Sequence, residues 1–240
     1  MISPLAYVDA SAKLGANVTV HPFAYIDKNV EIGDDCEIMP HVSIMSGTRM
    51  GKRNRIFNGA VIAAEPQDFN YKGDDTIVEI GDDNVIRENV VINRATNSGG
   101  KTIIGNGNFL HEGVHVSHDT HIGNHSVFGY GSKISGNCMI EDYVIFGGNV
   151  LVSQGCRVGT WSMTQTGCRF RKDVPPYIVA ALEPTTYYGV NSVILMHEGM
   201  SEKIVKHISH AYRIIYQGNA SIFDALLMIK DPVSYTHLTL

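Results

Sequence analysis

Five of the eleven histidines lie within a stretch of fifteen residues: His111, His115, His118, His121 and His125. Such a cluster has two chemical uses, metal binding and proton transfer, because a neutral imidazole is both a metal ligand and a base that titrates near neutral pH. His118 is followed directly by Asp119. A carboxylate beside an imidazole can orient the ring and stabilise the imidazolium that forms on proton uptake. The pair therefore predicts a general base, His118, supported by Asp119.

The elements that must position these residues follow from an apolar period of six. Neither an α-helix, with its period near 3.6, nor an ordinary strand, with a period of two, explains this spacing. It is typical of a solenoid with three short faces and eighteen residues per coil. We predict an all-β, left-handed parallel β-helix over residues 1–172. Its inward residues are Ile2, Val8, Leu14, Val20, Ile26, Ile32, Ile38, Ile44, Met50, Ile56, Ile62, Ile80, Ile86, Ile92, Ile104, Leu110, Val116, Ile122, Phe128, Ile134, Ile140, Phe146, Val152 and Val158.

The same periodicity bears on metal binding. In such a coil, side chains of one chain stack only when they are eighteen residues apart, and no two of the histidines have that spacing or twice it. His115 and His121 occupy equivalent positions on different faces, which argues against a zinc site within one chain, although ligation between subunits remains open. We predict no metal site and no cofactor.

Two segments interrupt the repeat, near 63–77 and 94–102, and we expect both to be loops that leave the coil. Such excursions often form the binding surface of a solenoid, and a tolerated insertion is the alternative. The Pro175-Pro176 pair ends the repeat, because proline cannot continue a helix and restricts its predecessor. For residues 173–232 we predict a small C-terminal α-helical domain. Its main helix begins after Ser201 and stops at Gly218, and a shorter helix covers 221–229.

Composition indicates which binding partners and which cellular compartment to expect. A net charge of −5 and a pI near 6.1 argue against nucleic-acid binding, although the local basic cluster of Arg169, Arg171 and Lys172 could attract an acidic partner or simply be solvated. The four cysteines lack metal-binding or disulfide spacing, which favours a reducing compartment. No apolar run is long enough to span a bilayer. We expect a cytoplasmic protein without stable membrane insertion, and residues 233–240 look like a non-native tail.

Several segments together resemble one enzyme family. They are Gln67-Asp68, residues 78–88, the run GVHVSHD at 113–119, residues 173–177 and Gly189-Val190-Asn191. On these segments the chain resembles the UDP-N-acetylglucosamine 3-O-acyltransferases, in the form expected of Bacteroides-like bacteria, over nearly its whole length. The resemblance implies a homotrimer with active sites between subunits. It also implies transfer of a (R)-3-hydroxyacyl chain from acyl carrier protein to the 3-hydroxyl of UDP-N-acetylglucosamine, the first step of lipid A synthesis.

The resemblance also implies roles for individual residues. His118 is the base and the Gly136 backbone N–H stabilises the oxyanion. The implied substrate contacts are Asp68, His115, Asn137, Gln154 and Asn191, and the candidate residues that measure the acyl chain are Met163, Gln165 and Thr166. The chain departs from the family where many members carry lysine, which is Asn70 here with Lys72 as a candidate substitute. It departs again at His197 and Glu198, where the family has paired arginines near the diphosphate.

Other functions remain open at this point. A coenzyme A-dependent hexapeptide acetyltransferase acting on another sugar would share the repeat, but the long first loop and the GVHVSHD run favour the carrier-protein enzyme. A non-catalytic trimeric scaffold predicts that His118→Ala changes no reaction. A metal-dependent hydratase predicts stoichiometric zinc or iron in the purified protein.

Overall fold

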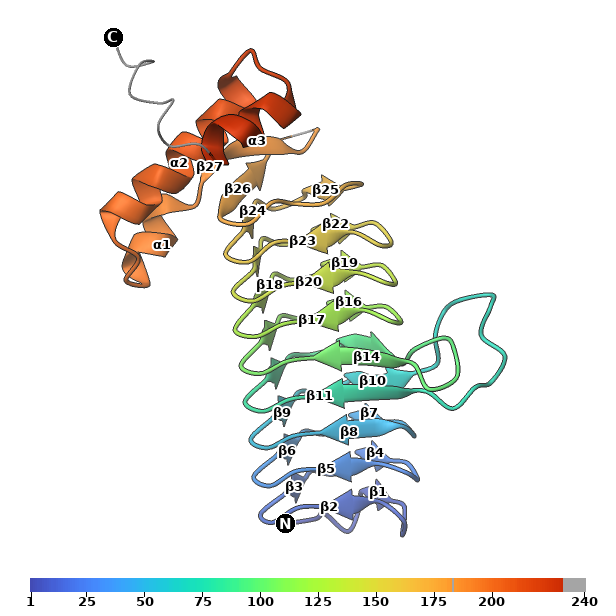
Figure 1. Cartoon of the computed structure of the whole chain (residues 1–240). Coiled ribbons are helices and arrows are strands. Elements are labelled where there is room, and N and C mark those ends of the chain that lie inside the picture. The colour runs from blue at the N-terminus through green and yellow to red at the C-terminus, as the bar shows by residue number, and fades with distance from the viewer. Residues whose placement is uncertain (183, 231–240) are drawn as a thin grey trace.

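Short parallel strands, stacked coil upon coil, form three sheets that run the length of the molecule (Figure 1). The computed structural model describes residues 1–182 and 184–230, so the tail expected at 233–240 lies outside the described residues. The first sheet contains β1 (Tyr7–Val8), β4 (Tyr25–Ile26), β7 (Ser43–Ile44), β10 (Val61–Ala64), β13 (Val91–Asn93), β16 (His115–Val116), β19 (Lys133–Ile134), β22 (Leu151–Val152) and β25 (Arg169–Phe170).

The other two sheets have the same stacked order. The second contains β2 (Lys13–Leu14), β5 (Glu31–Ile32), β8 (Thr48–Met50), β11 (Ile77–Ile80), β14 (Lys101–Ile104), β17 (His121–Ile122), β20 (Met139–Ile140) and β23 (Arg157–Val158). The third contains β3 (Thr19–Val20), β6 (Glu37–Ile38), β9 (Arg55–Ile56), β12 (Val85–Ile86), β15 (Phe109–Leu110), β18 (Val127–Phe128), β21 (Ile145–Phe146), β24 (Met163–Thr164), β26 (Ile178–Ala181) and β27 (Thr186–Val190).

The core is the column of period-six residues. From Val20 to Val158 every one of them is buried, as the repeat predicts. Each fully buried aliphatic side chain contributes roughly 1.5–3 kcal/mol relative to exposure, and the stack accumulates this term coil by coil. Ile2 keeps the register by pairing with Val20 but is 52% exposed. Its expected burial is therefore wrong, because the first coil has a neighbouring coil on one side only.

The corners of the coil determine where the side chains after each strand point. Asp119, which comes directly after His118 at the corner that follows β16, has a φ of 57°. Asn137 occupies the equivalent corner one coil later and has a φ of 59°. Asp and Asn adopt this left-handed conformation more readily than other non-glycine residues. The chain therefore turns immediately after His118, which leaves this side chain at the edge of the first sheet.

Two loops leave the coil beside this corner. Residues 65–76 connect β10 to β11, and residues 94–100 connect β13 to β14. The strands that flank one loop pair with those that flank the other, Val61 with Val91 and Ile77 with Lys101, so the loops emerge from adjacent coils and lie side by side (Figure 1). The predicted interruptions of the repeat are these two loops.

The C-terminal part begins with strands. After Pro176, β26 continues the third sheet and β27 pairs with it antiparallel, and neither strand is predicted by the sequence pattern. Three helices follow: α1 (Ser192–His197), α2 (Glu202–Gln217) and α3 (Ile222–Lys230). The Ser201 hydroxyl accepts a hydrogen bond from the Ile204 N–H, and Gly218 ends α2, as predicted.

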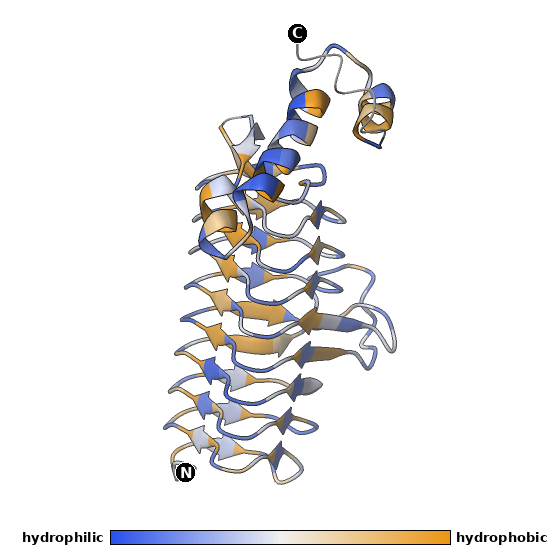
Figure 2. Cartoon of the chain, turned by 60° about the vertical axis from the view of Figure 1, so that its left-hand side comes forward, coloured by the Kyte–Doolittle hydropathy of each residue, from blue (hydrophilic) through white to orange (hydrophobic). Residues whose placement is uncertain are grey.

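Helix α2 shows hydrophobic residues on one side and hydrophilic residues on the other (Figure 2). It is joined to the coil by Tyr212, whose hydroxyl donates to the Pro176 carbonyl at 2.7 Å and whose ring stacks on Tyr187. Burial raises the pKa of this phenol well above its usual range, so it remains a donor. Among the described residues, no helix has the length and apolar character needed to cross a membrane.

Candidate active site

His118 is 7% exposed, and its imidazole contacts three polar side chains. Its Nδ1 lies 2.9 Å from Asp119 Oδ2 and 2.9 Å from the Thr96 hydroxyl, and its Nε2 lies 3.3 Å from Asp68 Oδ2. Because the Asp119 carboxylate accepts, we assign the proton to Nδ1, which leaves the Nε2 lone pair free to act as a base. The structure thus brings together the predicted base, its predicted carboxylate partner and Asp68 from the first loop.

The Asp119 carboxylate is itself held by the second loop. Its Oδ2 accepts a hydrogen bond from the Thr96 N–H at 3.1 Å, and the Asp119 N–H donates to the Thr102 hydroxyl at 2.9 Å. Thr96 therefore contacts both members of the pair, through its hydroxyl to His118 and through its backbone to Asp119. This arrangement restrains the imidazole in one orientation, which general base catalysis requires.

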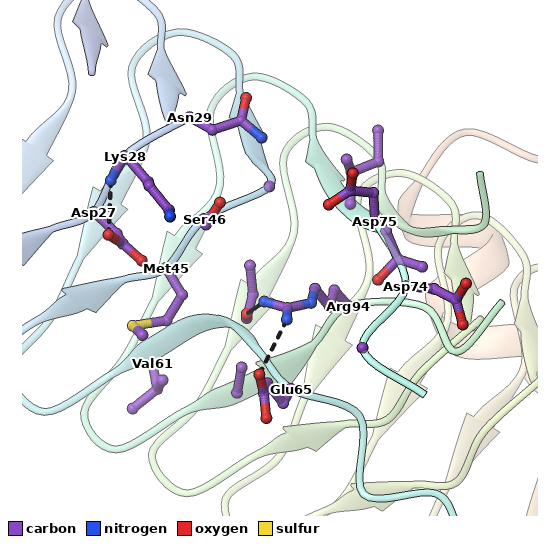
Figure 3. A pocket seen from close by; sticks show the side chains of 16 residues that line it. Asp27, Lys28, Asn29, Met45, Ser46, Val61, Glu65, Asp74, Asp75 and Arg94 are labelled. Carbon is purple, nitrogen blue, oxygen red and sulfur yellow. Dashed lines mark hydrogen bonds and ion pairs between the residues drawn. The ribbon is translucent and has the colours of Figure 1, made fainter. Parts of the chain in front are cut away.

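Asp68 reaches His118 because the first loop is anchored at several points. Its other carboxylate oxygen accepts the Asn70 N–H at 2.7 Å. Arg94, from the end of β13, donates to the Tyr71 hydroxyl at 2.6 Å and contacts Glu65 at 3.3 Å (Figure 3). The two loops are thus joined to each other, and the Asp68 carboxylate is placed opposite Nε2.

A hollow of about 510 Å³ lies at the base of the first loop (Figure 3). Its wall includes Lys28, Glu65, Asp75 and Arg94, and neither His118, Asp119 nor Asp68 lines it. His118 is the candidate for the chemistry, because among the described residues its ring contacts two carboxylates, Asp119 and Asp68. Arg94 lines the hollow and also joins the two loops through the Tyr71 hydroxyl.

His115 acts as a neutral donor rather than as a second base. Its Nε2–H donates to Asn93 Oδ1 at 2.6 Å, and the Asn93 amide donates to the Glu65 carbonyl at 2.6 Å. Burial, with a smaller effect of the Lys133 charge, lowers the pKa of His115 below its usual value. Within the described residues, no three His, Cys, Asp or Glu side chains converge as metal ligands.

Gly136 lies against the base, one coil further along. A Cβ added at this position would be 2.5 Å from His118 Nε2, and the Asn137 N–H donates to the His118 carbonyl at 3.0 Å. In the part of the chain that the structure describes, the Gly136 N–H itself makes no hydrogen bond. Gln154 occupies the next equivalent corner and is exposed. Gly136 and Gln154 therefore continue the column of His118, and Asn137 continues that of Asp119.

Other predicted site residues lie elsewhere in this chain. Asn191 begins α1 and donates to the Trp161 carbonyl at 3.1 Å, and α1 and the two loops lie on opposite sides of the coil (Figure 1). The candidate ruler residues Met163, Gln165 and Thr166 belong to β24 and the corner that follows it.

The positions that depart from the family pattern are exposed. Asn70 and Lys72 lie on the first loop, where the Lys72 ammonium donates to the Phe69 carbonyl at 3.1 Å. His197 and Glu198 face each other at 3.1 Å. The Glu198 carboxylate thereby places a negative charge where the family resemblance implies a cation.

Sequence reasoning missed Thr96, Arg94 and Tyr71, which hold the loops and the base in place. The only signal for them was the interruption of the repeat at 94–102 and the aromatic and charged residues within the first interruption. Neither signal identifies which side chain meets which, because these contacts join residues more than twenty positions apart.

Comparison with known proteins agrees with this geometry. Residues 173–238 match the family model described as UDP N-acetylglucosamine O-acyltransferase, domain 2, and residues 101–136 match the bacterial transferase hexapeptide repeat. The curated acyl-[acyl-carrier-protein]--UDP-N-acetylglucosamine O-acyltransferase of Xanthomonas axonopodis pv. citri is 42% identical over 233 residues, 96% of this chain and 89% of that protein.

Solved structures extend the similarity to three dimensions. The crystal structure of LpxA, a UDP-N-acetylglucosamine acyltransferase from Bacteroides fragilis, superimposes with a TM-score of 0.95 at 52% identity, covering 96% of this chain and 90% of that one. The Francisella novicida UDP-N-acetylglucosamine acyltransferase gives 0.93 at 37% identity, with 96% and 85% covered. These matches confirm the left-handed β-helix with its small helical end. The sequence and the fold agree, and the chain belongs to the UDP-N-acetylglucosamine O-acyltransferase family.

Proposed function

We propose that the chain transfers an acyl group from acyl carrier protein to the 3-hydroxyl of UDP-N-acetylglucosamine, with His118 as general base. The observation that carries the proposal is the position of His118 Nε2, which is left without a proton by the Asp119 contact at Nδ1 and faces Asp68 at 3.3 Å. A sugar hydroxyl hydrogen-bonded to Nε2 would donate its proton to Nε2 while its oxygen attacks the thioester carbonyl. Asp119 would stabilise the imidazolium that results.

The tetrahedral intermediate then needs a donor for its oxyanion. Gly136 lies against the His118 ring, and its N–H makes no hydrogen bond within the described chain, which suits this role. Collapse of the intermediate expels the carrier-protein thiolate, which takes up the proton from the imidazolium. The proton balance closes without a metal ion or a covalent enzyme intermediate.

A complete site requires more than one copy of the chain. Asn191 and the His118 corner belong to one site by family resemblance, yet within one chain they lie on opposite sides of the coil (Figure 1). We propose a homotrimer in which α1 of one subunit faces the His118 corner of the next. His115, Asn137 and Gln154 would contact the substrates, with Asn70 or Lys72 from the first loop. Met163, Gln165 and Thr166 would limit the acyl length.

We place the reaction in the cytoplasm, because all four cysteines are unpaired thiols, which suits a reducing compartment. The test is transfer of a 3-hydroxyacyl group from acyl carrier protein to UDP-N-acetylglucosamine by the wild type and by His118→Ala. The variant should lose about 10²–10⁴-fold in kcat while remaining trimeric. Equal activity of the two proteins would exclude His118 as the base. Activity only with acyl-coenzyme A would instead identify a coenzyme A-dependent transferase.

A further inference from the structure

Three neighbouring cations lie near the C-terminal end of the coil. Arg169, Arg171 and Lys172 lie on β25 and the corner after it, all exposed, and none forms an ion pair within the residues that the structure describes. Most other cations of the coil are paired with carboxylates. The paired ones are Lys13, Arg49, Lys52, Arg53, Arg55, Arg87, Arg94, Lys101 and Arg157.

These three residues, which we call the basic cluster, line a hollow of about 710 Å³ together with Phe170, Tyr187 and Tyr216. Among the residues that the structure describes, Asp173 is the one carboxylate in its wall, and that group accepts a hydrogen bond from the Arg157 N–H at 2.8 Å. The cluster therefore keeps a positive local charge on a chain whose net charge is −5. An anionic partner meets an attractive local field there, while most of the surface does not attract it.

The register of the coil relates the basic cluster to the base. In the first sheet His115 pairs with Lys133, Lys133 with Leu151, and Leu151 with Arg169. The corners follow the same order, so Lys172 lies three coils beyond His118 in one column, above Gly136 and Gln154. With a spacing of about 4.8 Å between neighbouring strands, the column is about 14 Å long.

This length distinguishes the anions that the basic cluster could bind. The diphosphate of the sugar nucleotide is attached to the same ring as the reacting hydroxyl, so it must lie within about one sugar width of His118. A cluster three coils away is too distant for it. A carrier protein, in contrast, holds its thioester at the end of a long phosphopantetheine arm, and its protein surface must dock at some distance from the base.

Resting on the proposed function, we propose that Arg169, Arg171 and Lys172 bind an acidic face of the acyl carrier protein. The prosthetic arm then runs along the column from Lys172 past Gln154 and Gly136 to His118. Charge complementarity of this kind increases the association rate and selects the partner more than it changes the chemical step. The basic cluster should therefore affect the carrier-protein donor and leave small thioester donors unaffected.

The experiment compares the triple variant Arg169→Glu/Arg171→Glu/Lys172→Glu with a control, Lys13→Glu/Lys52→Glu/Lys206→Glu, which changes the net charge equally at other exposed positions. For acyl carrier protein as donor, we expect the cluster variant to lower kcat/KM at least about tenfold, with a weaker dependence on salt than in the wild type. Transfer from the corresponding acyl-pantetheine should stay within about twofold of wild type. The control variant should resemble the wild type with both donors.

A direct binding measurement tests this docking proposal independently of the proposed function. Binding of holo-acyl carrier protein, measured by surface plasmon resonance, should be strong for the wild type and weak for the cluster variant, whether or not transfer occurs. An equal loss with both donors, or unchanged binding, would overturn the docking assignment. Binding of wild type to vesicles of anionic phospholipid but not to carrier protein would assign the cluster to a lipid surface instead. Size-exclusion chromatography of all three proteins confirms that they share one oligomeric state.

Discussion

The backbone of Gly136 lies directly against the imidazole of His118, so that a Cβ at position 136 would stand 2.5 Å from the nitrogen we assign as the base. The contact follows from the eighteen-residue coil, which stacks position 136 on position 118. It leaves no space for any side chain on this side of the ring. The proposed oxyanion donor, the Gly136 N–H, therefore belongs to a residue that lies against the proposed base.

Gly136→Ala should therefore displace the His118 ring and impair catalysis. A displacement of about 1 Å in a reacting group can cost on the order of 100-fold, and we expect a loss of this size in kcat. Steady-state kinetics of the variant against the wild type provide the measurement. Gly189→Ala is the control, because a Cβ there meets no atom within 4 Å. Near wild-type activity of Gly136→Ala would contradict the stacked arrangement.

Asp119→Asn should show how far the carboxylate supports the base. An amide at this position cannot stabilise the imidazolium and can favour the wrong tautomer, so kcat should fall about 10²–10⁴-fold with little change in KM for UDP-N-acetylglucosamine. Circular dichroism should remain that of the wild type. A variant that retains full kcat would mean that Asp119 has no part in proton transfer.

Thr96→Val should have a smaller effect through the same ring. The substitution removes the hydroxyl 2.9 Å from His118 Nδ1 and keeps the backbone N–H that binds Asp119. Loss of one such hydrogen bond, worth about 1 kcal/mol, corresponds to a decrease in kcat of about fivefold. Thr96→Ser should restore the activity, because serine keeps the hydroxyl. If the serine variant is as impaired as the valine variant, the hydroxyl is not what positions the ring.

Tyr71→Phe should loosen the first loop without altering the base. The Tyr71 hydroxyl accepts the short hydrogen bond from Arg94 that joins the two loops. Because Asp68 reaches His118 from this loop, we expect KM for UDP-N-acetylglucosamine to increase several-fold, about 1 kcal/mol in binding, with a smaller change in kcat. Tyr188→Phe serves as the control, since Tyr188 is 63% exposed. An unchanged KM would show that the loop is held by its other contacts.

The Cys138 thiol should be unreactive in the native protein. It is buried, its Sγ donates to the Ser153 carbonyl, and burial raises its pKa to about 11. The thiolate fraction at pH 8 is then about 10⁻³, and alkylation requires the thiolate. Iodoacetamide at pH 8, followed by mass spectrometry, should label this residue only after unfolding. Rapid labelling of the folded protein would contradict its burial.

The raised pKa of Cys138 also has a consequence for stability. The folded state favours the neutral thiol, so the stability that depends on this group is complete below the pKa of the unfolded thiol, near 9, and decreases as the pH rises through about 11. The free energy of unfolding of the wild type should therefore fall more between pH 8 and pH 10 than that of Cys138→Ala. Denaturant titrations at both pH values measure the difference.

The sequence by itself determined the coil and its register, and it singled out His118 as the candidate base. Period-six burial, the loop positions and the limits of α2 all follow from local patterns, since each depends on residues within one coil or one helix. The pairing of His118 with Asp119 is likewise local, because the two are adjacent in the chain. The strands β26 and β27 were not predicted, because neither the pairing of β26 with β24 nor that of β27 with β26 follows from the repeat.

Only the tertiary structure decided what surrounds the base. Asp68 and Thr96 approach His118 from two loops that are fifty and twenty-two residues away along the chain, and Arg94 joins those loops through Tyr71. Loop conformations depend on such long-range contacts rather than on a periodic pattern, so residue types alone do not identify the partners. In the coil, residues that are eighteen positions apart in the sequence are stacked on one another. This stacking places Gly136 against His118 and the basic cluster three coils beyond it.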